Sequence, residues 1–247
     1  MIRNLYRLTL LLCATAPTYA ADRFEFQGIA RDLDGDTVLY QEMHRVSGIC
    51  TEGSFRPLAH DVEYQNESNS NSFANKTLNY EGSPIRPSLD FQQPDFNEQL
   101  QITYPEPTSL EILWQPPEDK RKVFTVSFDE GLVVDAGFDH FVRTHWQAVT
   151  AGESVEFRFL APTRGDHYGF VLEPAPKSKL NADIVVQIRP TSLVLRFLVD
   201  PIILGYNQNG ALTHYKGLTN IRADSETNFS AHIRYEVTRY PACDLTS

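Results

Sequence analysis

The residues of this chain that could do chemistry are scattered over many short segments, as its seven histidines illustrate. His140 and His145 lie five residues apart on a predicted helix, so their side chains diverge and cannot bind one ion as an i, i+4 pair would. The other five lie in separate segments that only the fold could bring together: His44, His60, His167, His214 and His232. The histidine spacing therefore predicts no metal site.

Three alternating aspartates, Asp32, Asp34 and Asp36, could present oxygen ligands to calcium. The helix-loop-helix calcium pattern needs glycine at its sixth position and glutamate at its twelfth, where this chain has Thr37 and Met43. Because strands are predicted on both sides, we interpret the segment as a hairpin turn. We predict no metal ion and no cofactor.

Nucleophilic catalysis has no local signature in the chain. The Gly-x-Ser-x-Gly turn and Gly-rich phosphate loops are absent. Paired carboxylates for sugar hydrolysis are weak support, because some pair among 32 acidic residues always lies at a plausible distance. No catalytic residue is assigned. The densest cluster of polar groups lies on a predicted turn, and we take Arg164, Asp166 and His167 there as candidate ligand-binding residues.

The first 20 residues have the order of a cleavable signal peptide. Arg3 and Arg7 precede the apolar run 8–14, and small residues end the segment at Ala20. We predict cleavage after Ala20. The remaining residues 21–247 are expected to form one β-rich domain in the periplasm, with full secretion as the alternative.

Removal of the leader also removes Cys13 and leaves two cysteines, Cys50 and Cys243. Disulfides persist in the compartments that exported proteins reach. We therefore expect a Cys50–Cys243 disulfide that ties the tail to the front of the chain. The alternative is two buried free thiols.

Charge and hydropathy exclude several classes of partner. Without the leader, 20 basic and 32 acidic residues give a net charge of −12. Such a surface repels phosphate backbones and anionic headgroups, so we expect no nucleic acid, and peripheral membrane binding is disfavoured. No apolar run reaches the roughly 20 residues of a bilayer span, because Arg196 and Asp200 interrupt 193–204.

Alternation of apolar and polar residues is the main secondary-structure signal. It predicts about a dozen strands, among them 124–128, 155–159, 193–199 and 233–237, with short hairpin turns between them. One segment, 137–150, has the apolar spacing of a helix. The expected fold is mainly β, a curved antiparallel sheet or open barrel packed against one central helix.

A curved sheet that faces one helix often leaves an apolar pocket between them. The chain has two Trp, eleven Tyr and fifteen Phe, most of which must be core. Three aromatic residues of the predicted helix could line such a pocket, and we take Phe138, Phe141 and Trp146 as further candidate ligand-binding residues.

Three segments carry a resemblance: 138–160, Asp200-Pro201 and 215–221. They resemble parts of uncharacterised exported proteins of Gram-negative bacteria. That family implies no activity. More loosely, the expected architecture is similar to periplasmic lipoprotein carriers of the LolA and LolB type, without a shared motif and without implying their function.

Three functional hypotheses follow. The first is a non-enzymatic periplasmic binding or envelope-maintenance protein that holds a lipid or another apolar or amphipathic ligand in its curved sheet. The second is a hydrolase of envelope or extracellular polymers, which would need a polar cleft of Asp, Glu or His. The third is a structural module that docks to an envelope protein by a sheet edge or an exposed apolar patch.

Overall fold

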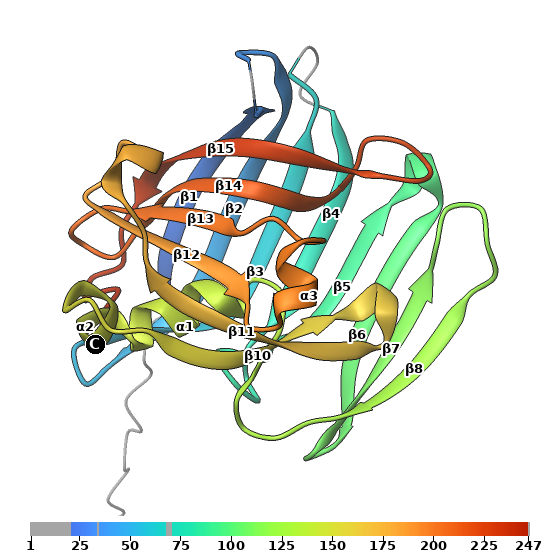
Figure 1. The fold of residues 1–247 in the computed structure, drawn as a ribbon, viewed down its shortest axis with the longest axis horizontal. Helices are drawn as coiled ribbons and strands as arrows, with labels where there is room; N and C mark the ends of the chain where they lie inside the picture. The colour runs from blue at the N-terminus through green and yellow to red at the C-terminus, as the bar shows by residue number, and fades with distance from the viewer. Residues whose placement is uncertain (1–20, 34, 68–70, 247) are drawn as a thin grey trace, which may run out of the picture.

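A computed structural model describes residues 21–33, 35–67 and 71–246, and its fifteen strands all belong to one large curved sheet (Figure 1). The predicted signal peptide and Asp34 lie outside the described residues. The strands are β1 (Asp22–Asp32), β2 (Val38–Thr51), β3 (Ser54–Gln65), β4 (Ser72–Asn79), β5 (Ser88–Gln93), β6 (Glu98–Glu106), β7 (Ser109–Gln115), β8 (Lys122–Ser127), β9 (Leu132–Val133), β10 (Val155–Ala161), β11 (Asp166–Pro174), β12 (Ile184–Pro190), β13 (Ile202–Tyr206), β14 (Leu212–Arg222) and β15 (Asn228–Arg239). The helices are α1 (Gly137–Thr144), α2 (Trp146–Thr150) and α3 (Leu193–Arg196), with 3-10 turns η1 (Pro94–Phe96), η2 (Pro162–Arg164) and η3 (Lys177–Lys179).

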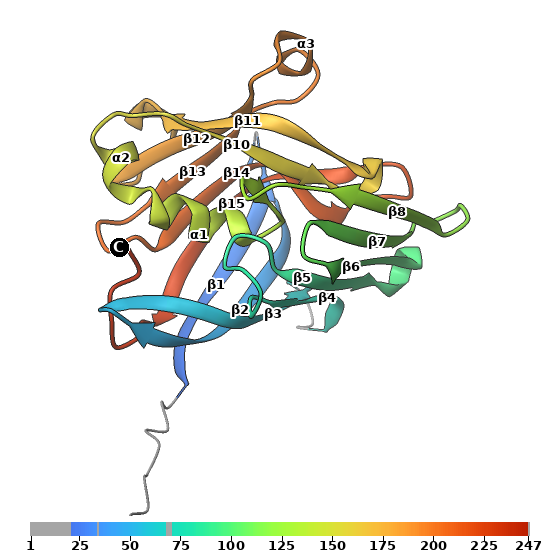
Figure 2. The ribbon, with the colours of Figure 1, turned by 90° about the horizontal axis from the view of Figure 1, so that it is seen from below.

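The first strand, β1, lies in the middle of the sheet, and the chain forms antiparallel meanders on both sides of it. Its strand order is β8-β7-β6-β5-β4-β3-β2-β1-β15-β14-β13-β12-β11-β10-β9. Neighbouring strands are antiparallel, except that β9 runs parallel to β10. The sheet is strongly curved, and in the described residues no ladder joins its two ends, so it is not closed (Figure 2). The predicted mainly β, curved sheet is confirmed.

The helical segment differs from the prediction, because 137–150 breaks at His145 into α1 and α2. Thr144 Oγ1 donates to the carbonyl oxygen of His140 at 3.0 Å, and His145 Nδ1 lies 2.9 Å from the carbonyl oxygen of Phe141. Side chains that bind carbonyls of the preceding turn compete with the backbone and bend helices. The expectation of one central helix is therefore wrong: two short helices pack near one end of the sheet.

A second difference concerns 193–199, which was predicted as a strand. The segment instead forms α3 and its flanking connection between β12 and β13. These two strands pair directly with each other from Ile184↔Tyr206 to Ile188↔Ile202. Because the ladder between them is complete, no position remains there for a further strand.

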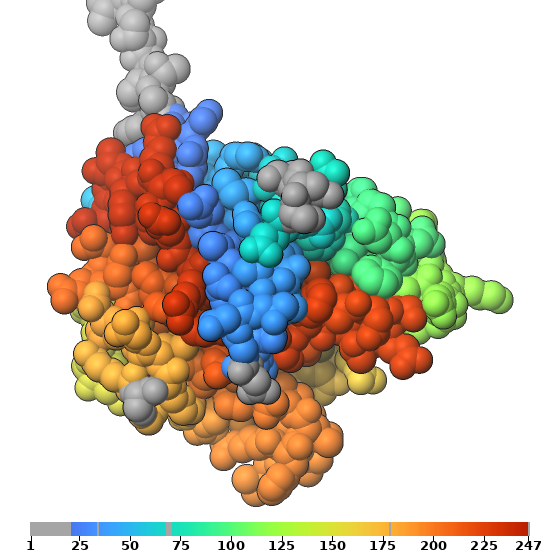
Figure 3. All heavy atoms as spheres, turned by 90° about the horizontal axis from the view of Figure 1, so that it is seen from above, coloured from blue at the N-terminus to red at the C-terminus, as the bar shows by residue number. Residues whose placement is uncertain are grey.

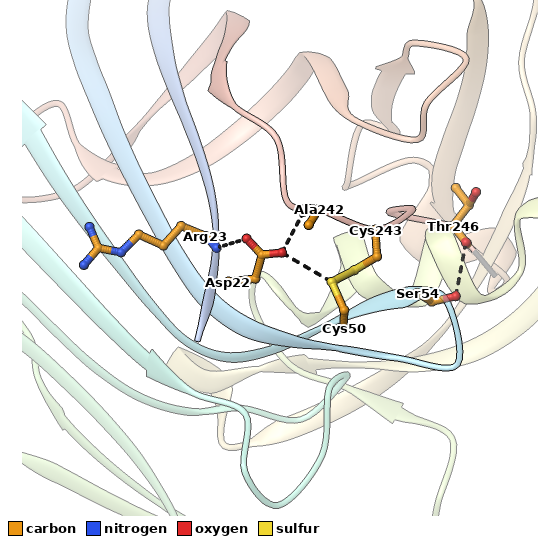
Figure 4. The surroundings of a disulfide bond; sticks show 7 residues. All are labelled: Asp22, Arg23, Cys50, Ser54, Ala242, Cys243 and Thr246. Carbon is orange, nitrogen blue, oxygen red and sulfur yellow. Dashed lines mark hydrogen bonds between the residues drawn. A yellow bond between two sulfur atoms is a disulfide. The ribbon is translucent and has the colours of Figure 1, made fainter. Parts of the chain in front are cut away.

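The expected disulfide is confirmed, and it joins β2 to the C-terminal tail (Figure 4). Cys50 and Cys243 have Cα atoms 5.9 Å apart and are separated by 193 residues. Asp22 lies beside the bond, where its Oδ2 accepts a hydrogen bond of 2.6 Å from the backbone N–H of Ala242. The tail is also held by a parallel bridge between Ser54 and Asp244.

The inward faces of the strands carry the core, as the alternating pattern requires. One cluster lies on the inward faces of β1–β8 and β14–β15, and a second packs α1 and α2 against β10–β14. A third, with Phe24, Phe55 and Leu245, seals the end that carries the disulfide. Among the described residues, none of the helices is both long and apolar enough to cross a membrane.

We predict that the disulfide stabilises the fold mainly by restricting the unfolded chain. For a loop of this length the chain-entropy model gives an upper bound of about 5 kcal/mol. The double variant Cys50→Ser/Cys243→Ser should lose a few kcal/mol of unfolding free energy in urea titrations. Reductant should destabilise the wild type to the same level and leave the variant unchanged. Equal stability of variant and wild type would show that the tail contacts suffice.

Candidate functional site

The curved sheet encloses a cavity of about 410 Å³. Its volume lies in the range of small-molecule binding sites. Side chains from β1 to β6, from β10 to β15 and from α1 reach its wall. Much of the wall is aromatic or aliphatic, with Phe24, Phe26, Val62, Phe91 and Ile233 among its buried residues. The interior of the sheet is therefore not filled solid.

One part of the wall carries a hydrogen-bonded chain of side chains, which we call the histidine chain: Glu42, His44 and His60. Glu42 Oε2 lies 2.9 Å from His44 Nε2, and His44 Nδ1 lies 2.9 Å from His60 Nε2. Tyr235 donates its hydroxyl proton to the same Glu42 oxygen at 2.8 Å. The His44 ring stacks on Phe26 with a centroid separation of 4.2 Å, which fixes its plane.

The hydrogen bonds of the histidine chain determine its tautomers when the histidines are neutral. An ionised carboxylate only accepts, so the His44 proton sits on Nε2 and faces Glu42. His44 Nδ1 then accepts from His60 Nε2–H, and His60 Nδ1 keeps its lone pair. Burial lowers the pKa of His60 well below 6.5, and neighbouring His44, Lys76 and Arg143 lower it further. His60 is thus a neutral hydrogen-bond acceptor at the cavity wall.

Four tyrosines surround Glu42 in the sheet interior. Burial, followed by the negative charge of Glu42, raises the pKa of each of them: Tyr40, Tyr64, Tyr215 and Tyr235. They remain neutral hydroxyls with aromatic faces at any physiological pH. The Tyr40 and Tyr64 rings meet edge to face at 6.1 Å.

A second polar group in the cavity is a buried ion pair. Lys76 Nζ lies 3.0 Å from both carboxylate oxygens of Asp135. The side chains are only 6% and 12% exposed. Asn220 donates a further hydrogen bond of 2.8 Å to Asp135. Asp135 has φ of +43°, a left-handed conformation that aspartate tolerates better than most residues, and it leads directly into α1.

Two more ion pairs line the cavity. Arg222 makes a two-pronged bond to Glu98, with distances of 2.8 and 2.7 Å. Arg143 contacts Asp139 at 2.6 Å and donates to the carbonyl oxygen of Gly210 at 3.0 Å. Burial raises the pKa of Asp139, while Arg143 and Tyr206 oppose that shift.

The charges of the wall do not balance. Its buried or half-buried carboxylates are Glu42, Glu98, Asp135 and Asp139, whereas its cations are Lys76, Arg143 and Arg222. Among the described residues, Glu42 has no Lys or Arg partner. With neutral histidines and all four carboxylates ionised, the interior therefore has one negative charge in excess.

The three helix residues expected to bind a ligand have different positions. Phe138 lines the cavity and packs near Tyr215, with ring centroids 6.3 Å apart. Phe141 instead lies in the core against Phe157 at 4.7 Å, and Trp146 packs edge to face on Tyr206. The cavity wall does not include Phe141 or Trp146.

The three candidate residues of the β10–β11 turn lie outside the cavity wall. Arg164 and Asp166 are exposed, as expected for a hairpin tip. His167 Nδ1 accepts from Arg158 Nε at 2.7 Å, and its Nε2 lies 3.2 Å from the carbonyl oxygen of Ser127 at the end of β8. The contact with Ser127 links β8, at one end of the open sheet, to β11, near its other end.

The sequence motifs do not select most of the polar residues of the cavity wall, although the alternation of their strands contains a signal for them. In β2, the side chains of Glu42 and His44 lie on the same face of the strand as those of buried Tyr40 and Val46. Lys76 likewise lies between buried Ala74 and Leu78 in β4. A charged residue on the apolar face of an alternating strand must be paired in the interior, which marks it as a candidate.

The structure also shows which histidines and which residues of metal-ligand type lie close together. It brings His44 to His60, and on β14 and β15 it stacks His214 on His232 with centroids 5.5 Å apart. In the described ranges, three ligand-type residues meet closely at Asp22, Cys50 and Cys243. Both sulfurs there belong to the disulfide, so the group offers no thiolate to a metal.

Comparisons with known proteins give little further information. No family model and no curated protein matches the chain. A solved crystal structure is similar in outline: a beta-barrel-like protein of domain of unknown function DUF1849 from Brucella abortus. It has 7% sequence identity and a TM-score of 0.40, over 91% of this chain and 98% of that one. The likeness to LolA and LolB carriers is not shown by these comparisons.

The buried pair predicts a test of stability. Lys76→Met should cost about 3–5 kcal/mol in unfolding free energy, because it leaves the Asp135 carboxylate buried without its cation. The double variant Lys76→Met/Asp135→Asn should recover part of that loss in a urea-denaturation cycle. Lys122→Met is the matched control, since Lys122 and Asp119 are also 3.0 Å apart but exposed, and should cost less than about 1 kcal/mol. Equal costs for both lysines would contradict the assignment.

The lowered pKa of His60 predicts a pH dependence. Below pH 6.5 the unfolded chain protonates this histidine while the folded protein does not, so unfolding takes up a proton. The unfolding free energy should therefore fall as pH drops from 6.5 toward the lower folded pKa. His60 contributes up to about 1.4 kcal/mol per pH unit. His60→Gln should flatten this slope in urea titrations at a series of pH values, and identical slopes would refute the prediction.

Proposed function

We propose that the protein is an exported, non-enzymatic binding protein that holds one small amphipathic ligand inside its curved sheet. The observation that carries the proposal is a cavity of about 410 Å³ whose wall is largely apolar yet contains Glu42 without a Lys or Arg partner. The confirmed disulfide is compatible with export.

The hydrogen-bond acceptors and charges of the cavity wall favour one kind of polar head group on the ligand. Glu42 and the lone pair of His60 are both acceptors, and four neutral tyrosines present aromatic faces nearby. A head group that donates hydrogen bonds or carries a positive charge offsets the excess negative charge. An anionic head group adds a second like charge at low dielectric. The favoured ligand therefore has an apolar tail and an ammonium or hydroxyl head.

A second candidate function is hydrolysis, because the histidine chain has the order of a proton relay. His60 Nδ1 could take a proton from water while that water attacks an ester carbonyl, and Glu42 would then stabilise the positive charge passed to His44. This candidate predicts turnover of a bound ester, whereas the binding proposal predicts that the ligand is recovered unchanged.

We expect dodecylamine to bind the wild-type protein about tenfold more tightly than laurate, a difference of ~1.4 kcal/mol, with dodecanol between them. Isothermal titration calorimetry compares the three, since only their head groups differ. Glu42→Gln should remove the preference for the amine. Glu63→Gln is the control, because Glu63 lies on β3 with its side chain 41% exposed and outside the cavity wall.

Val62→Phe should weaken all three probes equally by filling part of the cavity, while Val123→Phe on the outside of β8 should change nothing. Failure of all probes to bind, or equal effects of the Val62 and Val123 variants, would overturn the binding proposal. Ethyl laurate added to the same protein separates the candidates: hydrolysis that is lost in His60→Gln would favour the enzyme.

A further inference from the structure

The connection between β12 and β13 carries the large apolar side chains with the highest exposed fractions among the described residues. Leu193, Val194, Phe197 and Leu198 are 70%, 69%, 89% and 74% exposed, and Val199 follows at 40%. We call these five residues the apolar tip. It stands away from the body of the molecule as a narrow projection (Figures 2 and 3). Contiguous exposed apolar residues of this kind mark an interaction site.

The second half of the apolar tip satisfies its backbone N–H groups within the segment. The N–H groups of residues 196–199 all donate within the segment, to the carbonyls of Ser192, Val194 and Leu195, at 2.9–3.2 Å. Arg196, at the centre of the segment, donates from Nε to the carbonyl oxygen of Pro190 at 2.9 Å. A segment that enters hydrocarbon must satisfy its backbone internally, because no water is present there.

The base of the apolar tip belongs to the cavity. Val199, Asp200 and Ile202 line the cavity wall, and Val199 and Asp200 are exposed as well. The cavity therefore reaches the molecular surface where the apolar tip joins the sheet. Whatever covers the apolar tip also lies beside this opening.

Area and chemistry favour lipid over a protein partner. Five side chains on a single turn present less than the roughly 800 Å² per partner of a stable protein interface. Protein interfaces also use about one hydrogen bond per 100–200 Å², whereas the five side chains of the apolar tip offer no donor or acceptor. The segment is also electrically neutral, since Arg196 and Asp200 cancel, so it escapes the repulsion that the acidic surface meets.

We propose that the apolar tip inserts into a phospholipid surface and so places the cavity opening against the membrane. Insertion is driven by apolar burial and needs no basic patch. Transfer of a ligand between membrane and cavity rests on the proposed function, but insertion itself does not.

The test uses the disulfide-bonded protein and phosphatidylcholine vesicles in flotation assays. The wild type should float with the vesicles at low and high salt alike, and added phosphatidylglycerol should weaken binding because the protein is acidic. Leu193→Ser/Phe197→Ser/Leu198→Ser should lower vesicle binding by about tenfold or more. Val123→Ser is the control, since Val123 is 57% exposed on β8 and outside the cavity wall, and should float as the wild type does.

Depth of insertion provides a second readout. Phe197→Trp should gain fluorescence quenching by brominated lipids over the background of the two native tryptophans, and Val123→Trp on β8 should not. Failure of the wild type to float, or equal flotation of the triple-serine variant, would overturn the proposal and leave a protein partner to be sought. Probe binding in lipid-free solution should be the same for wild type and triple variant. Loss of probe binding with intact, tip-dependent flotation would refute the proposed function alone.

Discussion

The pairing of β1 with β15 is the contact on which the rest of the structure depends. Eight residue pairs, from Glu25↔Arg239 to Asp32↔Ala231, join the first strand to the last. One meander runs outward from β1 to β8, and the other returns from β10 to β15. Without this seam the two meanders would be separate curved sheets. The Cys50–Cys243 bond and the Ser54–Asp244 bridge fix the same seam at one end.

Curvature then creates an interior that polar residues can share with aromatic ones. Inward-facing positions of β2, β3 and β4 place the histidine chain and Lys76 in a region that also contains Phe26, Tyr64 and Phe91. Buried charges are tolerated there because they are paired, as Lys76 is with Asp135. Glu42 has His44 and Tyr235, rather than a Lys or Arg, as its hydrogen-bond partners. With neutral histidines this difference gives the cavity the excess negative charge on which the proposed ligand preference rests.

The apolar tip and the cavity have opposite physical requirements, yet they adjoin. The apolar tip exposes hydrocarbon on a convex turn, whereas the cavity removes it from water in a concave wall, and Val199 belongs to both. A molecule with an apolar tail could pass between a lipid surface and the cavity without crossing much water. In the proposed function, the apolar tip and the cavity are therefore the two ends of one path for the ligand.

By itself the sequence determined the local features, because these depend on neighbouring residues. Alternation along strands such as 155–159 predicted the mainly β fold, and two cysteines in an expected exported domain predicted their pairing. Only the tertiary structure decided where the alternating faces meet: it placed His44 beside His60 and Lys76 beside Asp135, 59 residues apart. It also broke the predicted helix at His145 and excluded 193–199 from the sheet. These outcomes depend on long-range pairing and on competition for hydrogen-bond partners, which local periodicity does not encode.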